Sequence, residues 1–248
     1  MTERSLVSTF TRPCKALIVG GRGGIGRGLL EQLRSDPLID DLHDWSRANA
    51  NDPDSSIKWT EVDITDEASI SAAAKLLDGI DLVIVATGHL HSADGRAPEK
   101  SWRDLSTEQM TENFLVNTVG PTLVAKHVLP LLLRRERAVF AVLSARVGSI
   151  EDNRLGGWYR NRASKAALNQ MIKSLSIELT RGRSDAICAG LHPGTVDTKL
   201  SRPFQSNVDP EKLFTTDRAA RQLLEVINGL TPKDTGGVFA WDGRRIPY

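Results

Sequence analysis

The sequence predicts an α/β fold: a single Rossmann-type, doubly wound domain with a parallel sheet of about seven strands and helices on both faces. Short, almost wholly apolar runs alternate with helix-length segments along the chain, as in sheets that are buried on both faces. A glycine-rich turn joins the first apolar run to the first helical pattern. The 248 residues, 40% of them hydrophobic, suffice for one large core.

The expected strands and helices alternate in order along the chain. Strands are predicted at 15–20, 42–45 (a weak pattern), 57–62, 81–86, 138–144, 186–192 and 237–241. Helices are predicted near 25–34, 67–77, 108–134, 160–181 and 216–228. The chain has no internal repeat, linker or low-complexity segment, so one domain over 1–248 is expected.

Charge and cysteine content exclude several classes of protein. The formal net charge is +1, so no basic surface for nucleic acid is expected. No apolar run is long enough for a signal peptide or a membrane span. Two isolated cysteines favour a reducing compartment, and the five histidines lack metal-ligand spacing. We expect a cytoplasmic protein without a metal, a nucleic-acid partner or a membrane.

The turn after the first strand has the spacing of a dinucleotide-binding loop. Gly20, Gly24 and Gly26 fit G-x-x-x-G-x-G, in a turn that follows a strand and opens a helix with an apolar stripe. Such a turn lets the backbone approach a pyrophosphate, while the helix N-terminus supplies N–H groups and a positive dipole. We therefore expect these glycines and Ile25 to contact a cofactor.

The position that distinguishes NADP from NAD carries a hydroxyl and a cation. An acid about 20 residues past the glycines would bind ribose hydroxyls, but this chain has Ser46 followed by Arg47. Arg22, within the glycine turn, adds a second cation. NADP(H) is predicted over NAD(H), because guanidinium pairs bidentately with phosphate. Asp44 keeps NAD(H) open, since a shift in strand register would place its carboxylate at the ribose.

With these features together, the chain resembles the short-chain dehydrogenase/reductase family, most closely its C-factor-like carbonyl reductase branch. The resemblance runs through VGGRGGIG, VDITD, VATG, NFLVNTVGP, VLSARVGSI, RASKAALN, HPGTVDT and the tail GGVFAWDGRRIPY. It implies hydride transfer between a nicotinamide and an aldehyde or ketone. It also implies cofactor contacts at Asp63, Ile64, Ala86, Thr87, Gly88, Pro193, Gly194, Val196 and Thr198.

The resemblance further implies the catalytic residues. Lys165 would bind the nicotinamide ribose, and Asn117 would hold a water that links the lysine to solvent. Pro121 lacks an N–H and should free the Asn117 carbonyl for that water, although an ordinary helix kink is the alternative. Ser144 would polarise the carbonyl oxygen.

The spacing of that serine departs from the family. Ser144 stands four residues before Gly148, where the family has three, and Ala145 occupies the strict position. Ser149 is a weaker candidate for the same role. A bend at the end of the strand could still present Ser144 to the carbonyl.

The residue four before the lysine is the main departure. In the family a tyrosine stands there and gives the proton, whereas this chain has Asn161 on the same helix face as Lys165. An amide can donate a hydrogen bond but has no proton to give, and general acid catalysis is worth about 10² to 10⁴ in rate. Tyr159 would lie about 240° round the helix from the lysine, so a pocket wall is expected there. His89 and His91 are alternative proton relays, although roles as loop caps or pocket walls are favoured.

Two functions therefore stay open for this chain. One is an NADP(H)-dependent carbonyl reductase that acts on a small carbonyl or alcohol and takes its proton from water or an unusual donor near Asn161. The other is a cofactor-binding pseudoenzyme that regulates a partner. Residues 199–215 are expected to form a lid over the substrate pocket, with apolar contacts from Leu200, Phe204 and Phe214. The helices at 108–134 and 160–181 could pair in a homodimer.

Overall fold

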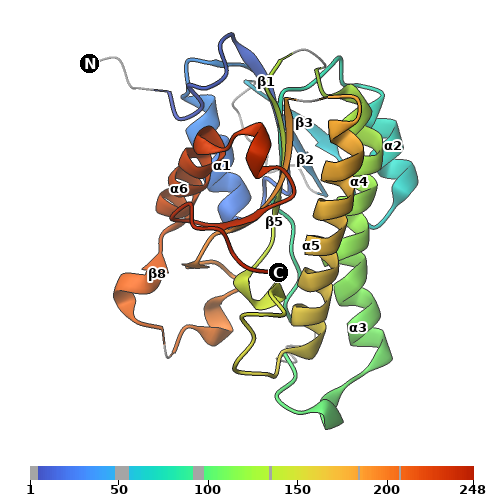
Figure 1. Cartoon of the computed structure of the whole chain (residues 1–248), viewed down its shortest axis with the longest axis vertical. Coiled ribbons are helices and arrows are strands. Elements are labelled where there is room, and N and C mark those ends of the chain that lie inside the picture. Colours follow the sequence, from blue (N-terminus) through green and yellow to red (C-terminus); the bar gives the residue numbers. More distant parts are fainter. Residues whose placement is uncertain (1–4, 48–55, 92–97, 134–135, 184, 207) are drawn as a thin grey trace.

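A seven-stranded parallel sheet forms the centre of the molecule (Figure 1). The computed structural model describes residues 5–47, 56–91, 98–133, 136–183, 185–206 and 208–248. The strand order is β3-β2-β1-β4-β5-β6-β9, and it reverses between β1 and β4, which confirms the predicted doubly wound fold. The strands are β1 (Cys14–Val19), β2 (Ile39–Ser46), β3 (Ile57–Glu61), β4 (Leu82–Val85), β5 (Ala138–Leu143), β6 (Ala186–His192) and β9 (Val238–Ala240).

Helices cover both faces of this sheet, so that each face has its own core. On one face α1 (Gly24–Arg34) packs against α6 (Thr216–Gly229), and on the other lie α2 (Glu67–Ala74), α4 (Gly120–Val128) and α5 (Tyr159–Thr180) (Figure 1). Successive residues of β1 alternate between the cores: Ile18 joins the α1–α6 side, and Leu17 and Val19 join the other. None of the helices in the described ranges has both the length and the hydrophobicity that a membrane crossing requires.

The helix predicted over 108–134 is interrupted, and in this respect the prediction was wrong. Helix α3 (Thr107–Phe114) leads into a π-helical turn (Leu115–Val119), α4 follows, and a 3₁₀ turn (Leu129–Leu131) ends the segment. At the π turn the Gly120 N–H bonds to the Leu115 carbonyl, five residues back, and the next residue, Pro121, has no N–H to continue the regular pattern. Pro130 similarly disfavours helix at Leu129. Residue 134, the predicted end, lies outside the described residues.

An excursion (residues 195–214) leaves the carboxyl edge of the sheet after β6. Its ends pair as a two-stranded parallel ladder, β7 (Thr195–Val196) with β8 (Leu213–Phe214). The Phe204 ring lies 5.2 Å from that of Trp158, at the start of α5, and 6.2 Å from that of His91, in the loop after β4. The excursion thus contacts two segments at the sheet edge where the predicted site lies, and its action as a lid remains a prediction.

Candidate functional site

The turn between β1 and α1 is packed so tightly that it admits only glycine at two positions. A Cβ at Gly26 would overlap the carbonyl oxygen of Gly20, and a Cβ at Gly21 would overlap the Asp44 carboxylate. The Gly23 N–H closes the turn onto the Gly20 carbonyl at 3.0 Å. No side chain caps α1, and its first turn contains no acidic residue. An uncapped helix N-terminus behind a bare backbone turn fits an anionic group such as a pyrophosphate.

The end of β4 brings three predicted cofactor residues to this turn. The Ala86 N–H bonds to the Val19 carbonyl at 2.7 Å, so the chain beyond β4 runs beside the glycines. The Thr87 methyl group lies against Gly20, and Gly88 follows. The Thr87 hydroxyl is buried and has no hydrogen-bond partner among the described residues. Because buried hydroxyls normally have a hydrogen-bond partner, we expect a polar ligand beside the turn to supply one for Thr87.

The excursion after β6 approaches the same turn from the other side. The Thr198 methyl group lies against Gly24, and Ile25 packs with Val196 and Phe214. Residues that the sequence places more than 170 positions apart are thus brought together at the start of α1. The glycine turn, the β4 end and this excursion therefore meet at the start of α1.

The end of β2 differs from its predicted role in detail. Asp44 is 0% exposed, so its carboxylate is out of reach of a ribose bound beside the glycine turn. The Ser46 hydroxyl donates to Asp44 Oδ2 at 3.2 Å and accepts from Trp59 Nε1 at 3.0 Å, so its proton is already engaged. Arg22 Nε lies 3.1 Å from Asp44 Oδ2, and Arg47 is exposed. Of the predicted phosphate ligands, the two arginines remain suited to the role and Ser46 does not.

Burial controls the titration of this carboxylate. It raises the pKa of Asp44 above its ordinary value, and the attraction of Arg22 with the hydrogen bonds from Ser46 and the Gly21 N–H partly offsets the rise. These partners favour the charged carboxylate, whereas burial disfavours it.

Asp63 and Ile64, the predicted adenine contacts, have structural partners. The Asp63 carboxylate accepts from the N–H of Thr65 at 2.9 Å and from its hydroxyl at 2.7 Å. These hydrogen bonds lower the pKa of Asp63, with a smaller contribution from Arg47. Ile64 is buried in the core under α2 and α4. Their contact with adenine stays a prediction.

Lys165 and Asn161 lie one turn apart on the same buried face of α5. Lys165 Nζ donates to the Leu143 carbonyl, at the end of β5, at 2.8 Å. Gly148 lets the turn after β5 lie directly against α5, because a Cβ there would lie 2.7 Å from the Lys165 backbone. Burial lowers the pKa of Lys165 to about 8. Among the described residues, none hydrogen-bonds with the Asn161 side-chain amide, which is therefore available to a ligand.

Asn117 joins the loop after β4 to α5. Its carboxamide holds the His89 peptide on both sides, accepting from the N–H at 2.8 Å and donating to the carbonyl at 2.8 Å. Nδ2 also lies 2.8 Å from Asn113 Oδ1 and 3.2 Å from Ser164 Oγ. The side chain is thus fully used in positioning the loop, and the water expected on its backbone carbonyl stays a prediction.

Ser144 does not lie beside Asn161. Its hydroxyl donates to Asn169 Oδ1 at 2.6 Å, and Asn169 is eight residues beyond Asn161, or about 12 Å along the helix axis. This placement argues against the predicted role of Ser144 in polarising a carbonyl. Ser149 is also engaged, since it donates to the Tyr248 carbonyl at 3.3 Å.

Tyr159 cannot turn back toward the lysine. It is the first residue of α5, which continues without a break to Thr180. Six helical positions therefore separate Tyr159 from Lys165, which places them about 240° apart around the helix. The expectation that Tyr159 is no substitute acid agrees with this helix start.

A buried ion pair beside Asn161 had no sequence signal. Arg160 is fully buried, and its Nη1 lies 2.9 Å from Glu99 Oε1 and hydrogen-bonds to Gln109. Arg160 Nη2 reaches the Leu90 carbonyl at 3.3 Å, and the Glu99 carbonyl accepts the Trp158 N–H at 2.6 Å. The pair ties the start of α5 to α3 and to the loop after β4. Because Glu99 and Arg160 are 61 residues apart, only the fold brings them together.

The histidines near the sheet edge have other environments. His89 Nε2 lies 3.6 Å from Glu112 Oε2, and burial lowers the pKa of His89. His91 contacts the Phe204 ring, and burial lowers the pKa of His192, at the end of β6, to about 4. Within the described ranges, no three His, Cys, Asp or Glu side chains are arranged to hold a metal ion.

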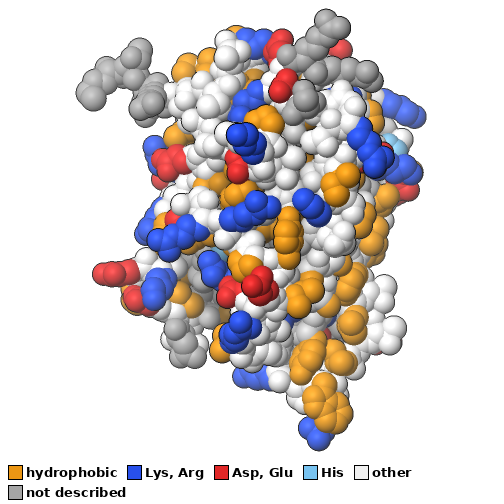
Figure 2. All heavy atoms as spheres, in the orientation of Figure 1, with side chains coloured by type: hydrophobic (Ala, Val, Ile, Leu, Met, Phe, Trp, Pro, Cys, Tyr) orange, Lys and Arg blue, Asp and Glu red, His pale blue; other side chains and the backbone are white. Residues whose placement is uncertain are grey.

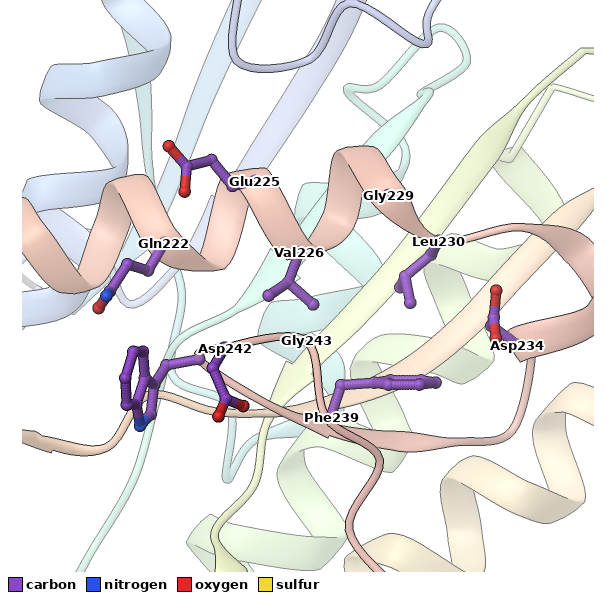
Figure 3. Close-up of a pocket in the computed structure, with 10 residues that line it drawn as sticks. Gln222, Glu225, Val226, Gly229, Leu230, Asp234, Phe239, Asp242 and Gly243 are labelled. Carbon is purple, nitrogen blue, oxygen red and sulfur yellow. The ribbon is translucent and has the colours of Figure 1, made fainter.

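A hollow of about 480 Å³ lies between α6 and the C-terminal segment (Figure 3). Val226, on α6, and Leu230, directly after it, point toward Phe239 (Figure 3). The hollow is lined by Gln222, Glu225, Val226, Gly229, Leu230, Asp234, Phe239, Trp241, Asp242 and Gly243. None of these is a predicted catalytic or cofactor residue.

Known proteins resemble the chain in sequence and in fold. An uncharacterized oxidoreductase of Schizosaccharomyces pombe is 28% identical and covers 93% of this chain and 96% of its own. The C-signal protein of Myxococcus xanthus is 32% identical over 58% of this chain and 82% of its own. A 1-hydroxy-2-glutathionyl-2-methyl-3-butene dehydrogenase of Rhodococcus is 31% identical over 75% of this chain and 78% of its own.

Solved structures agree with these relatives. The carbonyl reductase Sniffer of D. melanogaster superposes with a TM-score of 0.81 at 25% identity, over 94% of this chain and 99% of its own. An NADPH-bound carbonyl reductase from chicken fatty liver superposes with a TM-score of 0.82 over the whole of both chains, and at 23% identity it shows the fold alone. Residues 15–209 match the short chain dehydrogenase family, and the chain belongs to that family.

Proposed function

We propose that the protein is an NADP(H)-dependent oxidoreductase that reduces an aldehyde or ketone slowly. The observation that carries the proposal is the pair of Lys165 and Asn161, buried on one face of α5 at the edge of the sheet. The cofactor-binding segments converge at the same edge, where ligands of open α/β sheets bind. Similarity to a carbonyl reductase supports the substrate class.

Each group in the site has a role that its geometry supports. The glycine turn and the N-terminus of α1 hold the pyrophosphate, and Arg22 and Arg47 hold the 2′-phosphate. Lys165 binds the nicotinamide ribose. NADPH, when bound, supplies the hydride. As negative charge grows on the carbonyl oxygen, the Asn161 N–H stabilises it with a hydrogen bond, and water supplies the proton.

A cofactor-binding pseudoenzyme that regulates a partner is the second candidate. Asn161 has no proton to give, and the Ser144 hydroxyl is held by Asn169. Two groups that family members use on the carbonyl are thus replaced or turned away. The name of one relative, C-signal, also favours a signalling role. Both candidates require a bound dinucleotide, so cofactor binding alone does not separate them.

The substitution Asn161→Tyr separates the two functions. Oxidation of NADPH is followed with a panel of aldehydes and ketones, and Asn161→Phe serves as a control that adds the ring without the phenol. We expect slow turnover by the wild type, a gain of about 10² to 10⁴ in kcat for Asn161→Tyr, and none for Asn161→Phe.

Other outcomes contradict one or both functions. Brisk wild-type turnover that Asn161→Tyr leaves unchanged would mean that another group is the acid. No turnover by any variant, with NADPH bound to all, would favour the pseudoenzyme. Failure of the wild type to bind NADPH would contradict both candidates.

Pairing of two copies is also part of the proposal. Val119, in the π turn before α4, and Ile177, on α5, are 41% and 49% exposed. Hydrophobic side chains gather along this side of the molecule (Figure 2). Analytical ultracentrifugation of the wild type and of Val119→Lys/Ile177→Lys tests whether this face holds a homodimer.

A further inference from the structure

We infer that Asp44 is a positioning residue that sets cofactor selectivity by holding Arg22 beside the 2′-phosphate position. The inference rests on the proposed function, because it requires NADP(H) to occupy the glycine turn. Asp44 touches no cofactor atom in this scheme, since its carboxylate is 0% exposed. It acts through the backbone and the arginine above it.

Both oxygens of the Asp44 carboxylate are used. Oδ1 accepts the Gly21 N–H at 3.0 Å, and Oδ2 accepts the Ser46 hydroxyl at 3.2 Å. Arg22 Nε lies 3.1 Å from Oδ2 and supplies the compensating charge. Burying a carboxylate without such partners costs free energy of folding, so we infer that the Asp44 carboxylate serves to fix the turn and the arginine.

The carboxylate also supports the cofactor turn directly. A Cβ at Gly21 would overlap Oδ1, so the turn backbone rests on Asp44 without an intervening side chain. Trp59 Nε1 donates to Ser46 Oγ at 3.0 Å, which completes a chain of hydrogen bonds from β3 through β2 to the turn. Loop and strand are thus held in one arrangement.

Arg22 is oriented by this contact while remaining partly accessible. Its side chain is 26% exposed, and its terminal nitrogens have no hydrogen-bond partner in the described part of the chain. The contact with Asp44 is an ion pair without an aligned hydrogen bond at Nε, and it leaves the two terminal nitrogens available to a phosphate. The arginine has already lost rotamer freedom before the cofactor arrives, so less is lost on binding.

Isothermal titration of NADP⁺ and NAD⁺ tests the inference without any turnover. We expect Asp44→Asn to raise the Kd for NADP⁺ about tenfold and to leave the Kd for NAD⁺ within about twofold. Asp41→Asn is the matched control, since Asp41 lies on the same strand but pairs with Lys58 and His43. It should change neither Kd.

The variant Arg22→Lys tests whether NADP⁺ affinity depends on the fixed orientation of the guanidinium or only on its positive charge. Lysine keeps the charge but has no Nε, so it cannot contact Asp44 and present two further nitrogens. We expect Arg22→Lys to raise the Kd for NADP⁺ as much as Asp44→Asn does. Adding Asp44→Asn to Arg22→Lys should not change the ratio of the Kd values for NADP⁺ and NAD⁺ any further. This variant also serves if Asp44→Asn fails to fold, as thermal melting would show.

Three results would overturn the inference. If Asp44→Asn weakened the binding of NADP⁺ and NAD⁺ equally, Asp44 would stabilise the turn without affecting cofactor selectivity. Tighter NADP⁺ binding would mean that the carboxylate merely repels phosphate, and unchanged affinity of Arg22→Lys would make the fixed orientation irrelevant. If the wild type binds neither dinucleotide, the proposed function itself fails.

Discussion

The two parts of the sheet edge that we propose for the cofactor and for the substrate differ in how they are built. Around β1, β2 and β4, the glycine turn, the uncapped α1 and two arginines are in place. Around β5 and α5, Lys165 donates to the Leu143 carbonyl and Ser144 faces Asn169. In the proposed function, Asn161 takes the place of the proton donor. In the proposed function, cofactor binding is distributed over many backbone and packing contacts, whereas proton transfer depends on one side chain. A single substitution can therefore remove chemistry and leave binding intact.

The largest effect on cofactor affinity is expected from closing the cofactor turn. Gly26→Ala would place a Cβ against the Gly20 carbonyl oxygen. Overpacking on this scale costs about 1–3 kcal/mol, so we expect the Kd for NADPH to rise by up to about 100-fold in fluorescence titrations. Gly229→Ala is the control, because a Cβ there meets nothing within 4 Å. If Gly26→Ala bound NADPH with the affinity of the wild type, this turn would not be part of the cofactor site.

The next effect concerns the charge on Lys165. Its pKa is about 8 in the folded state against 10.5 ordinarily, a difference of roughly 3 kcal/mol at most. Below pH 8 both states carry the proton and the destabilisation is complete. Between pH 8 and 10.5 the unfolded state binds more protons, so stability rises with pH. We expect urea unfolding at pH 7.5 and 10 to show this rise for the wild type and not for Lys165→Met. Parallel pH profiles would mean that the ammonium is well solvated.

The smallest effect is expected at Ser144. Ser144→Ala removes the hydrogen bond to Asn169 and should lower the free energy of unfolding by about 1–2 kcal/mol. Carbonyl reduction should stay within about threefold of the wild type. Ser174→Ala removes an exposed hydroxyl of α5, the helix that carries Asn169. It should change neither the free energy of unfolding nor the rate of carbonyl reduction. A large loss of rate at unchanged stability would restore the catalytic role of Ser144.

Local patterns predicted much of the fold and part of the site. The apolar runs, the glycine turn and the Asn161–Lys165 spacing are each contained within a few residues, and the sheet and α5 agree with them. The break at 115–119 depends on how one proline is accommodated, which periodicity does not show. The engagement of Ser46 and the Arg160–Glu99 pair depend on strand register and on contacts between distant segments. Side-chain partnerships of this kind have no sequence spacing to reveal them.

The short β7–β8 ladder has a consequence for how such a protein can change. It fastens both ends of the excursion, and Phe214 is anchored on Trp241 with ring centroids 4.8 Å apart. Beyond Thr198, the peptide between these fixed ends can be exchanged, lengthened or shortened at little entropic cost, while the sheet and the contact of Thr198 with Gly24 stay undisturbed. New ligand preferences can therefore arise by changes within the excursion, while the sheet keeps its structure.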